Sequence, residues 1–106
     1  MGEELESGSP VSYTAIVLDQ RYDMSQSHSG SVGIDCSKAV IYAYGLSNNN
    51  GYLTVYDANG KSLGGTIAYS GTYTINASGI RSWKVSYNCP SGHASVSGGF
   101  NVTLYK

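Results

Sequence analysis

The chain has 106 residues and a formal net charge of −1, and 12% of its residues are charged, against roughly a quarter in an average soluble protein. This length suits one domain. The near-neutral balance gives no electrostatic footprint for nucleic acid or for an anionic membrane surface, and no run of about 18 apolar residues exists, so we expect neither nucleic-acid binding nor membrane insertion.

The residue types favour strands over helices. The chain contains 14 glycines, 10 tyrosines and 1 phenylalanine, and Ser, Thr and Asn are also abundant. Such a composition disfavours helices and suits short strands joined by tight loops. We therefore expect a disordered leader over residues 1–10, which are acidic and aperiodic, and a single all-β domain over residues 11–106.

The first expected strand is 11–18, which becomes apolar on both faces toward its end and so indicates an interior place in a sheet. Residues 19–30 are polar and are expected to form a loop. A short strand over 31–35 should then lead into Cys36.

Two tight loops divide the next stretch into three expected antiparallel strands. The first, residues 47–51, is rich in Asn and Gly, which tolerate the positive φ angles of turns. The second, around residues 58–60, allows two hairpins. A two-residue Asn-Gly turn would pair Ala58 with Lys61, whereas a three-residue loop ending in a left-handed glycine would pair Asp57 with Lys61.

The three-residue loop is the one we predict, because it sorts the side chains by face. It pairs Val55 with Leu63 and Leu53 with Gly65, whereas the two-residue turn mixes apolar and polar positions on both faces. The predicted core positions in this region are Ile41, Ala43, Leu53, Val55, Leu63 and Ile67.

The same register, carried across the first loop, pairs Leu46 with Tyr52 and leaves phenol rings on the opposite face. That face would present Tyr42, Tyr44, Tyr52 and Tyr56. The candidate ligand-binding residues are these tyrosines together with their polar neighbours Asn48, Asn49, Asn50, Ser62 and Thr66.

Strict alternation returns in the C-terminal third. Residues 80–89 place Trp83 on the apolar side, where we interpret it as a core residue rather than a sugar-stacking platform. Residues 94–106 supply the closing strands. The total of about seven or eight short strands predicts an antiparallel β-sandwich of the jelly-roll or immunoglobulin-like kind.

The cysteines, Cys36 and Cys89, are far apart in sequence and do not have metal-ligand spacing. In a chain of this composition we predict one disulfide between them, and hence an oxidising compartment and a secreted or cell-surface protein. The alternative is a pair of buried free thiols in a reduced protein.

Catalytic patterns are weak. His28 and His93 lie among many serines without a nucleophile-elbow motif, and the few carboxylates are scattered. We therefore predict no enzyme activity, no metal site and no cofactor. Asn76-Ala77-Ser78 and Asn101-Val102-Thr103 match the N-glycosylation pattern, which matters only in a eukaryotic secretory route.

The tyrosine face suggests a function. Flat aromatic rings with hydroxyl and amide neighbours on a weakly charged sheet suit a glycan or polysaccharide, and the composition resembles that of secreted carbohydrate-binding modules. The hypothesis is a secreted, non-catalytic, carbohydrate-binding module. The alternative is an extracellular protein-interaction domain, namely a cell-adhesion or surface module or an enzyme inhibitor, because protein-binding surfaces use the same residue types.

Overall fold

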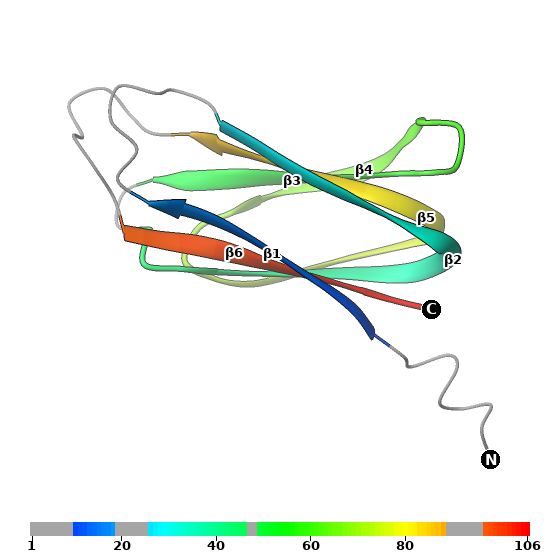
Figure 1. Ribbon diagram of the computed structural model, residues 1–106, viewed down its shortest axis with the longest axis horizontal. Helices are drawn as coiled ribbons and strands as arrows, with labels where there is room; N and C mark the ends of the chain where they lie inside the picture. The colour runs from blue at the N-terminus through cyan, green and yellow to red at the C-terminus, as the bar shows by residue number, and fades with distance from the viewer. Residues whose placement is uncertain (1–9, 19–25, 47–48, 89–96) are drawn as a thin grey trace, which may run out of the picture.

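Figure 1 shows a computed structural model of the chain, which describes residues 10–18, 26–46, 49–88 and 97–106. Its antiparallel strands are β1 (Pro10–Leu18), β2 (Gln26–Tyr44), β3 (Asn50–Tyr56), β4 (Ser62–Ala68), β5 (Gly71–Asn88) and β6 (Ser97–Tyr105). The all-β, antiparallel prediction is confirmed. The described ranges contain six strands rather than seven or eight, in part because residues 31–35, expected as a separate strand, are continuous with the following strand in β2.

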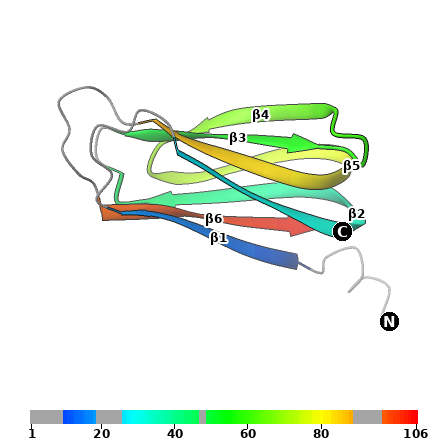
Figure 2. The ribbon, with the colours of Figure 1, turned by 45° about the horizontal axis from the view of Figure 1, so that its top comes forward.

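Two long strands serve both layers of the molecule. The sheet order is β1-β6-β2-β5-β3-β4, and β2 and β5 have 19 and 18 residues. Residues 38–44 of β2 pair with β6, whereas residues 82–88 of β5 pair with β3. One layer therefore holds β1 and β6 with the second half of β2 and the first half of β5, and the other holds β3 and β4 with the remaining halves (Figure 2).

β2 and β5 bend together where the register between them shifts. Residues 32–35 of β2 lie opposite Arg81 alone, and residues 77–79 of β5 then lie opposite Ser37 alone. Such bulges bend a strand and increase its twist. Gly79, with φ at 81°, occupies the left-handed region that glycine adopts without steric cost. The paired bulges thus carry both strands from one layer to the other.

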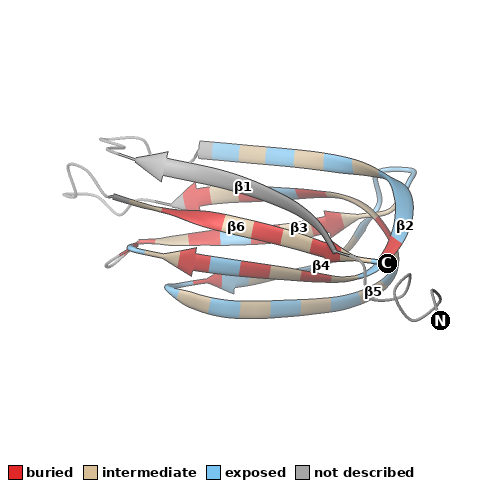
Figure 3. Ribbon diagram, turned by 60° about the horizontal axis from the view of Figure 1, so that its bottom comes forward, coloured by how far each residue is buried: buried red, intermediate tan, exposed pale blue. Residues whose placement is uncertain are grey.

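The core lies between the two layers (Figure 3). The ring of Tyr87 in β5 meets the ring of Phe100 in β6 edge-on, with 6.4 Å between centroids. Gly51 of β3 lies against the same Phe100 ring, since a Cβ at Gly51 would be 2.5 Å from it. The buried apolar residues are Cys36, Ala39, Ile41, Ala43, Leu46, Leu53, Val55, Ala68, Ile80, Trp83, Val85, Tyr87, Phe100, Val102 and Leu104. The interpretation of Trp83 as a core residue is confirmed.

The hairpin between β3 and β4 has the predicted three-residue loop. The Gly60 N–H donates to the Asp57 carbonyl at 3.0 Å, and the Asp57 N–H donates to the Lys61 carbonyl at 2.9 Å. Gly60 has φ of 84°, the left-handed value that this bulge requires.

A second bulge then shifts β4 by one residue. Val55 pairs with Gly64, and Tyr52 pairs with Ile67. Leu53 and Val55 are buried as predicted, but Ile67 faces outward and is 47% exposed. The prediction of Ile67 as a core residue is therefore wrong, because the glycine-rich strand absorbs an extra residue.

Two expectations for the N-terminal part are also wrong. β1 is a terminal strand of the described sheet rather than an interior one, because β6 pairs between β1 and β2. Residues 26–30, expected in a loop, belong to β2 and pair with β5. Residues 1–9 of the predicted leader lie outside the described residues, and Pro10 already belongs to β1.

The predicted disulfide is wrong, since Cys36 is a buried free thiol. Cys36 pairs with Ile80 at the bend, and the last described residue before Cys89 is Asn88, eight positions further along β5. Eight strand residues span roughly 26 Å, far beyond the Cα separation of about 4.4–6.8 Å that a disulfide needs. Cys89 itself lies outside the described residues. Without this disulfide, the cysteines no longer support the prediction of an oxidising compartment.

Candidate interaction surface

The predicted face of four tyrosines does not exist as one surface. β2 and β3 do not pair with each other. Tyr42 and Tyr44 lie on the second half of β2, in the β1–β6 layer, whereas Tyr52 and Tyr56 lie on β3, in the opposite layer. The chain between β2 and β3 crosses from one layer to the other, so the two pairs of rings point away from each other on opposite outer faces.

Of the chain between β2 and β3, the described residues Leu46 and Asn49 are buried rather than offered to a ligand. Leu46 is buried, and its N–H donates to Ser70 Oγ at 3.2 Å. The Asn49 side chain is also buried, and its Nδ2 donates to the Leu46 carbonyl at 3.0 Å. Asn49 is therefore a structural residue and not the exposed ligand-binding residue predicted. Asn48 lies outside the described residues, and Asn50 is half-buried.

On the β3–β4 layer, three large apolar side chains gather at the margin of the outer face. Tyr52 pairs directly with Ile67, and the two are 46% and 47% exposed. Tyr69, 53% exposed, follows Ile67 with the buried Ala68 between them, so Ile67 and Tyr69 both project outward. We call Tyr52, Ile67 and Tyr69 the β3–β4 patch.

The Tyr52 ring lies over a glycine of the neighbouring strand. A Cβ at Gly65 would be 2.7 Å from the Tyr52 hydroxyl and 2.9 Å from its ring. An aromatic ring over a glycine covers backbone that would otherwise be open to water. Tyr52 is thus packed against β4 and still half-exposed.

The surroundings of the patch are polar. Tyr52 pairs with Ser86 of β5, and Thr54 pairs with Lys84, so hydroxyls and one exposed cation lie along its inner side. Of the other predicted site residues, Ser62 is exposed and Tyr56 is half-buried on this layer. Thr66 pairs with the buried Leu53, so it lies on the opposite face from Tyr52. Its predicted place beside the tyrosines is wrong, because β4 is shifted by one residue.

The second pair of tyrosines forms a smaller surface on the β1–β6 layer. The Tyr42 and Tyr44 rings have centroids 5.5 Å apart and are tilted by 44°. Tyr42 pairs with Asn101 on one side and with Thr72 on the other. Nearby on this layer, Lys38 Nζ lies 4.5 Å from the centroid of the Tyr105 ring, a cation–π contact.

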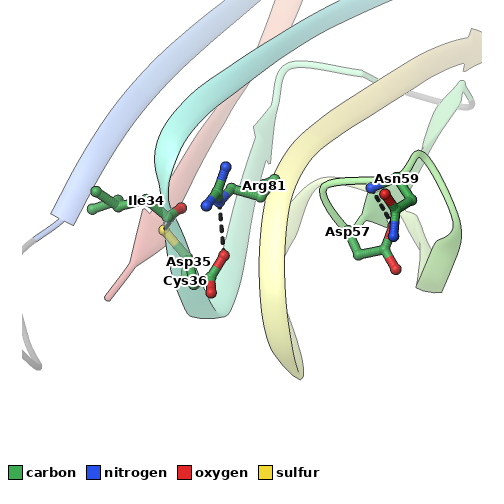
Figure 4. A network of polar contacts seen from close by, with 6 residues as sticks. All are labelled: Ile34, Asp35, Cys36, Asp57, Asn59 and Arg81. Carbon is green, nitrogen blue, oxygen red and sulfur yellow. Dashed lines mark hydrogen bonds and ion pairs between the residues drawn. The ribbon is translucent and has the colours of Figure 1, made fainter.

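Among the described ionisable side chains, Asp35, Arg81 and Asp57 make structural contacts (Figure 4). Arg81 Nε donates to Asp35 Oδ1 at 2.7 Å across the bend, with both side chains in solvent. Asp57 Oδ1 accepts from the Asn59 N–H at 2.8 Å, within the hairpin loop. Burial, and secondarily Asp35, raises the pKa of the Cys36 thiol above its ordinary value of 9.0, which opposes formation of a reactive thiolate.

Over the described ranges, no three His, Cys, Asp or Glu side chains come close enough to hold a metal ion. Of the residues considered for catalysis, His28 is half-buried in β2, and His93 lies outside the described residues. Within the same described ranges, no helix has the length and apolar character to cross a membrane.

Comparison with known proteins gives neighbours in fold only. No family model and no curated protein matches the chain. Among solved structures, PliG from Aeromonas hydrophila, a periplasmic lysozyme inhibitor of g-type lysozyme, has a TM-score of 0.57 at 10% identity, over 92% of this chain and 87% of PliG. The Gap123 complex from Streptococcus agalactiae gives 0.55 at 9% identity, over 92% of this chain and 37% of that chain.

The VP2 subviral particle of infectious bursal disease virus gives 0.53 at 15% identity, over 93% of this chain and 33% of that chain. The chain thus spans nearly all of PliG but only about a third of the other two proteins. Identities this low establish a common architecture alone. The fold and surface define an antiparallel, two-layered all-β protein with an exposed aromatic and aliphatic patch.

Proposed function

We propose that this chain is a non-catalytic protein-binding domain that works outside the cytoplasm and contacts its partner through the β3–β4 patch. The observation that carries the proposal is the juxtaposition of Tyr52, Ile67 and Tyr69, each about half exposed, beside a polar surround. Apolar anchors inside a polar rim are the usual anatomy of a protein interface, and tyrosine is enriched among residues that dominate binding energy.

An aliphatic side chain at the centre of the patch favours a protein over a sugar. Ile67 offers neither a flat ring nor a hydrogen-bonding group, and it pairs directly with Tyr52. A protein partner can bury both in one apolar pocket. Burying the exposed part of such side chains contributes roughly 25 cal/mol per Å² of apolar area.

The comparisons support the same class of function. PliG, which this chain resembles over nearly its full length, is named as an enzyme inhibitor and as periplasmic. An extracytoplasmic or surface location and an inhibitory or adhesive role are therefore part of the proposal. A g-type lysozyme is the first purified partner to test.

A glycan remains the second candidate, now confined to the Tyr42–Tyr44 pair. The specific observation in its favour is that Tyr42 has an amide and a hydroxyl residue, Asn101 and Thr72, as its cross-strand neighbours. Tilted rings beside such groups can contact both the C–H face and the hydroxyls of a sugar.

Paired variants separate the two candidates. A photo-cross-linking residue is placed at position 52 or at position 42, the chain is exposed to extracellular proteins of its source, and each cross-linked protein is purified for calorimetry. We expect a cross-link from position 52, and binding roughly thirtyfold weaker after Tyr52→Ala with Ile67→Ser, equivalent to about 2 kcal/mol. Tyr42→Ala, on the opposite face, is the matched control and should bind normally.

The proposal is wrong if cross-links form only from position 42, or if the double variant binds its partner as tightly as the parent chain. Affinity electrophoresis on polysaccharides tests the second candidate. Retardation that Tyr42→Ala abolishes and Tyr52→Ala preserves would replace the protein-binding proposal with a glycan-binding one.

A further inference from the structure

One side of the molecule ends in two strand edges that pair with no other described strand. β4 is the terminal strand of the sheet order, and residues 71–76 of β5 pair with β2 on one side and with no described strand on the other. The two edges lie one above the other, since a Cβ at Gly64 of β4 would be 3.7 Å from Cγ2 of Ile75. We call the edges of β4 and of residues 71–76 the open margin.

The core reaches solvent at this margin. Leu63, Tyr73, Ile75 and Ala77 pack against the core and are only partly buried. Along the first half of β5, side chains alternate between exposed and half-buried with none fully buried (Figure 3). The apolar side chains at this margin thus remain partly exposed to solvent, whereas those of the core itself are buried.

The margin lacks the features by which proteins keep strand edges apart. Residues 62–80 contain no charged residue and no proline, whereas natural edge strands usually carry lysine, proline or a bulge. β4 does have a bulge, at its register shift beside Val55. Residues 71–76, in contrast, pair with β2 in an unbroken register, which leaves a regular ladder of backbone donors and acceptors on their free side.

We propose that two copies of this chain associate through antiparallel pairing of residues 72–76 with the same residues of the second copy, so that Thr74 lies opposite Thr74 of the second copy. In a two-fold pairing each side chain approaches side chains of its own segment, so like charges would oppose it. Residues 71–76 carry no charge, so pairing with a second copy meets no such repulsion. A different partner could be attracted by complementary charge, but this segment offers no charge for it to complement. The absence of charge thus favours a second copy as the occupant.

The two-fold arrangement also matches the faces. It keeps the exposed Thr72 and Thr74 of both copies on the outer side, where threonines make favourable cross-strand pairs. Tyr73 and Ile75 of each copy stay on the inner side and cover the partly open core of the other. The association goes beyond the proposed function and uses a different surface, since the β3–β4 patch stays on the outer face.

The experiment measures self-association of the full chain by sedimentation equilibrium between roughly 1 µM and 1 mM. A pairing of five residues from each copy is smaller than a standard interface of ~1,600 Å², so we expect a reversible dimer. Thr74→Lys should raise its dissociation constant at least about tenfold, because the two introduced charges approach each other. Ser27→Lys, exposed on the opposite edge of β2, is the matched control and should leave it unchanged.

Hydrogen exchange locates the contact. In the parent chain, amides within 71–76 should become more protected as concentration rises, and Thr74→Lys should remove that protection. Thr72→Lys serves as a second charged variant, and a thermal melt confirms that each variant is folded. A chain that stays monomeric at the highest concentration overturns the proposal, and so does concentration-dependent protection confined to other strands or a dimer that both lysine variants leave intact. None of these variants alters the β3–β4 patch, so the outcome is independent of partner binding.

Discussion

At the scale of single residues, Gly51 of one layer lies close against the Phe100 ring of the other. A Cβ at Gly51 would lie 2.5 Å from two atoms of the ring, so Gly51→Ala must displace a fully buried aromatic side chain. Overpacking of this kind costs about 1–3 kcal/mol. We expect Gly51→Ala to lower the free energy of unfolding in urea by that amount.

Gly33→Ala is the matched control for that substitution. Gly33 has no atom within 4 Å of its Cβ position, so we expect a change within about 0.5 kcal/mol. Phe100→Leu should relieve part of the Gly51→Ala penalty, and a double-mutant cycle measures the coupling. Equal effects of Gly51→Ala and Gly33→Ala would show that β3 does not pack against β6 in this way.

The Cys36 thiol gives a pH dependence with a definite sign. Burial raises its pKa in the folded protein above the ordinary 9.0. In the unfolded chain the thiol loses its proton near pH 9, while the folded chain retains it, so unfolding becomes easier as pH rises above that value. Below about pH 8 both states are protonated and the contribution of Cys36 is constant.

We therefore expect the difference in unfolding free energy between the parent chain and Cys36→Ala to be constant from about pH 6 to pH 8, and to shrink toward about pH 10. Urea unfolding at fixed pH values measures it. The comparison with Cys36→Ala removes every contribution that the two proteins share. A difference that stays constant to pH 10 would contradict a buried thiol with a raised pKa.

At the scale of elements, the loop between β3 and β4 is fixed by one carboxylate. Asp57 Oδ1 accepts from the Asn59 N–H at 2.8 Å and from the Lys61 N–H at 2.9 Å. We expect Asp57→Ala to cost about 1 kcal/mol in thermal or urea unfolding, the typical contribution of such an exposed side chain to backbone hydrogen bonds. Asp57→Asn keeps an acceptor oxygen and should cost less than half as much. If Asp57→Ala is neutral, the loop does not depend on these bonds.

Local signals were sufficient for this hairpin. The sequence around Asn59-Gly60 allows two loops, and the alternation of Leu53 and Val55 with tyrosines favours the three-residue loop and predicts which face is buried. The bulge that turns Ile67 outward left no comparable signal. Two adjacent glycines, Gly64 and Gly65, lower the steric cost of such a shift, but they do not indicate whether it occurs.

The candidate site depended on a non-local relation and was therefore wrong in part. Tyr42 and Tyr52 belong to strands that are consecutive in sequence, which usually pair, yet they lie in different layers because β2 and β5 pair with each other across the bend. Nothing within residues 38–68 reports that β5 will insert between β2 and β3. The resulting β3–β4 patch contains one of the predicted tyrosines and two residues, Ile67 and Tyr69, that were not among the candidates.

At the scale of the whole molecule, stability rests on packing between the two layers and on the strand pairing through the bend. Most of the pairings join segments far apart in sequence, and the β3–β4 hairpin is a local exception among the described strands. Cys36 adds a buried apolar contact at the bend rather than a covalent link. The molecule thus holds its shape without the cross-link that its cysteine spacing indicated.

This absence of a cross-link gives a direct test of the architecture. A disulfide closing a loop of this length would contribute roughly 4 kcal/mol, most of the stability of a small domain. Because Cys36 is free beside Ile80, a thiol reductant should leave the urea midpoint of the parent chain unchanged. The midpoint of Cys36→Ala should lie below that of the parent chain by the same amount with and without reductant. A midpoint that falls on reduction in the parent chain, but not in Cys36→Ala, would require Cys36 to lie next to another cysteine and would place the bend of β2 and β5 elsewhere.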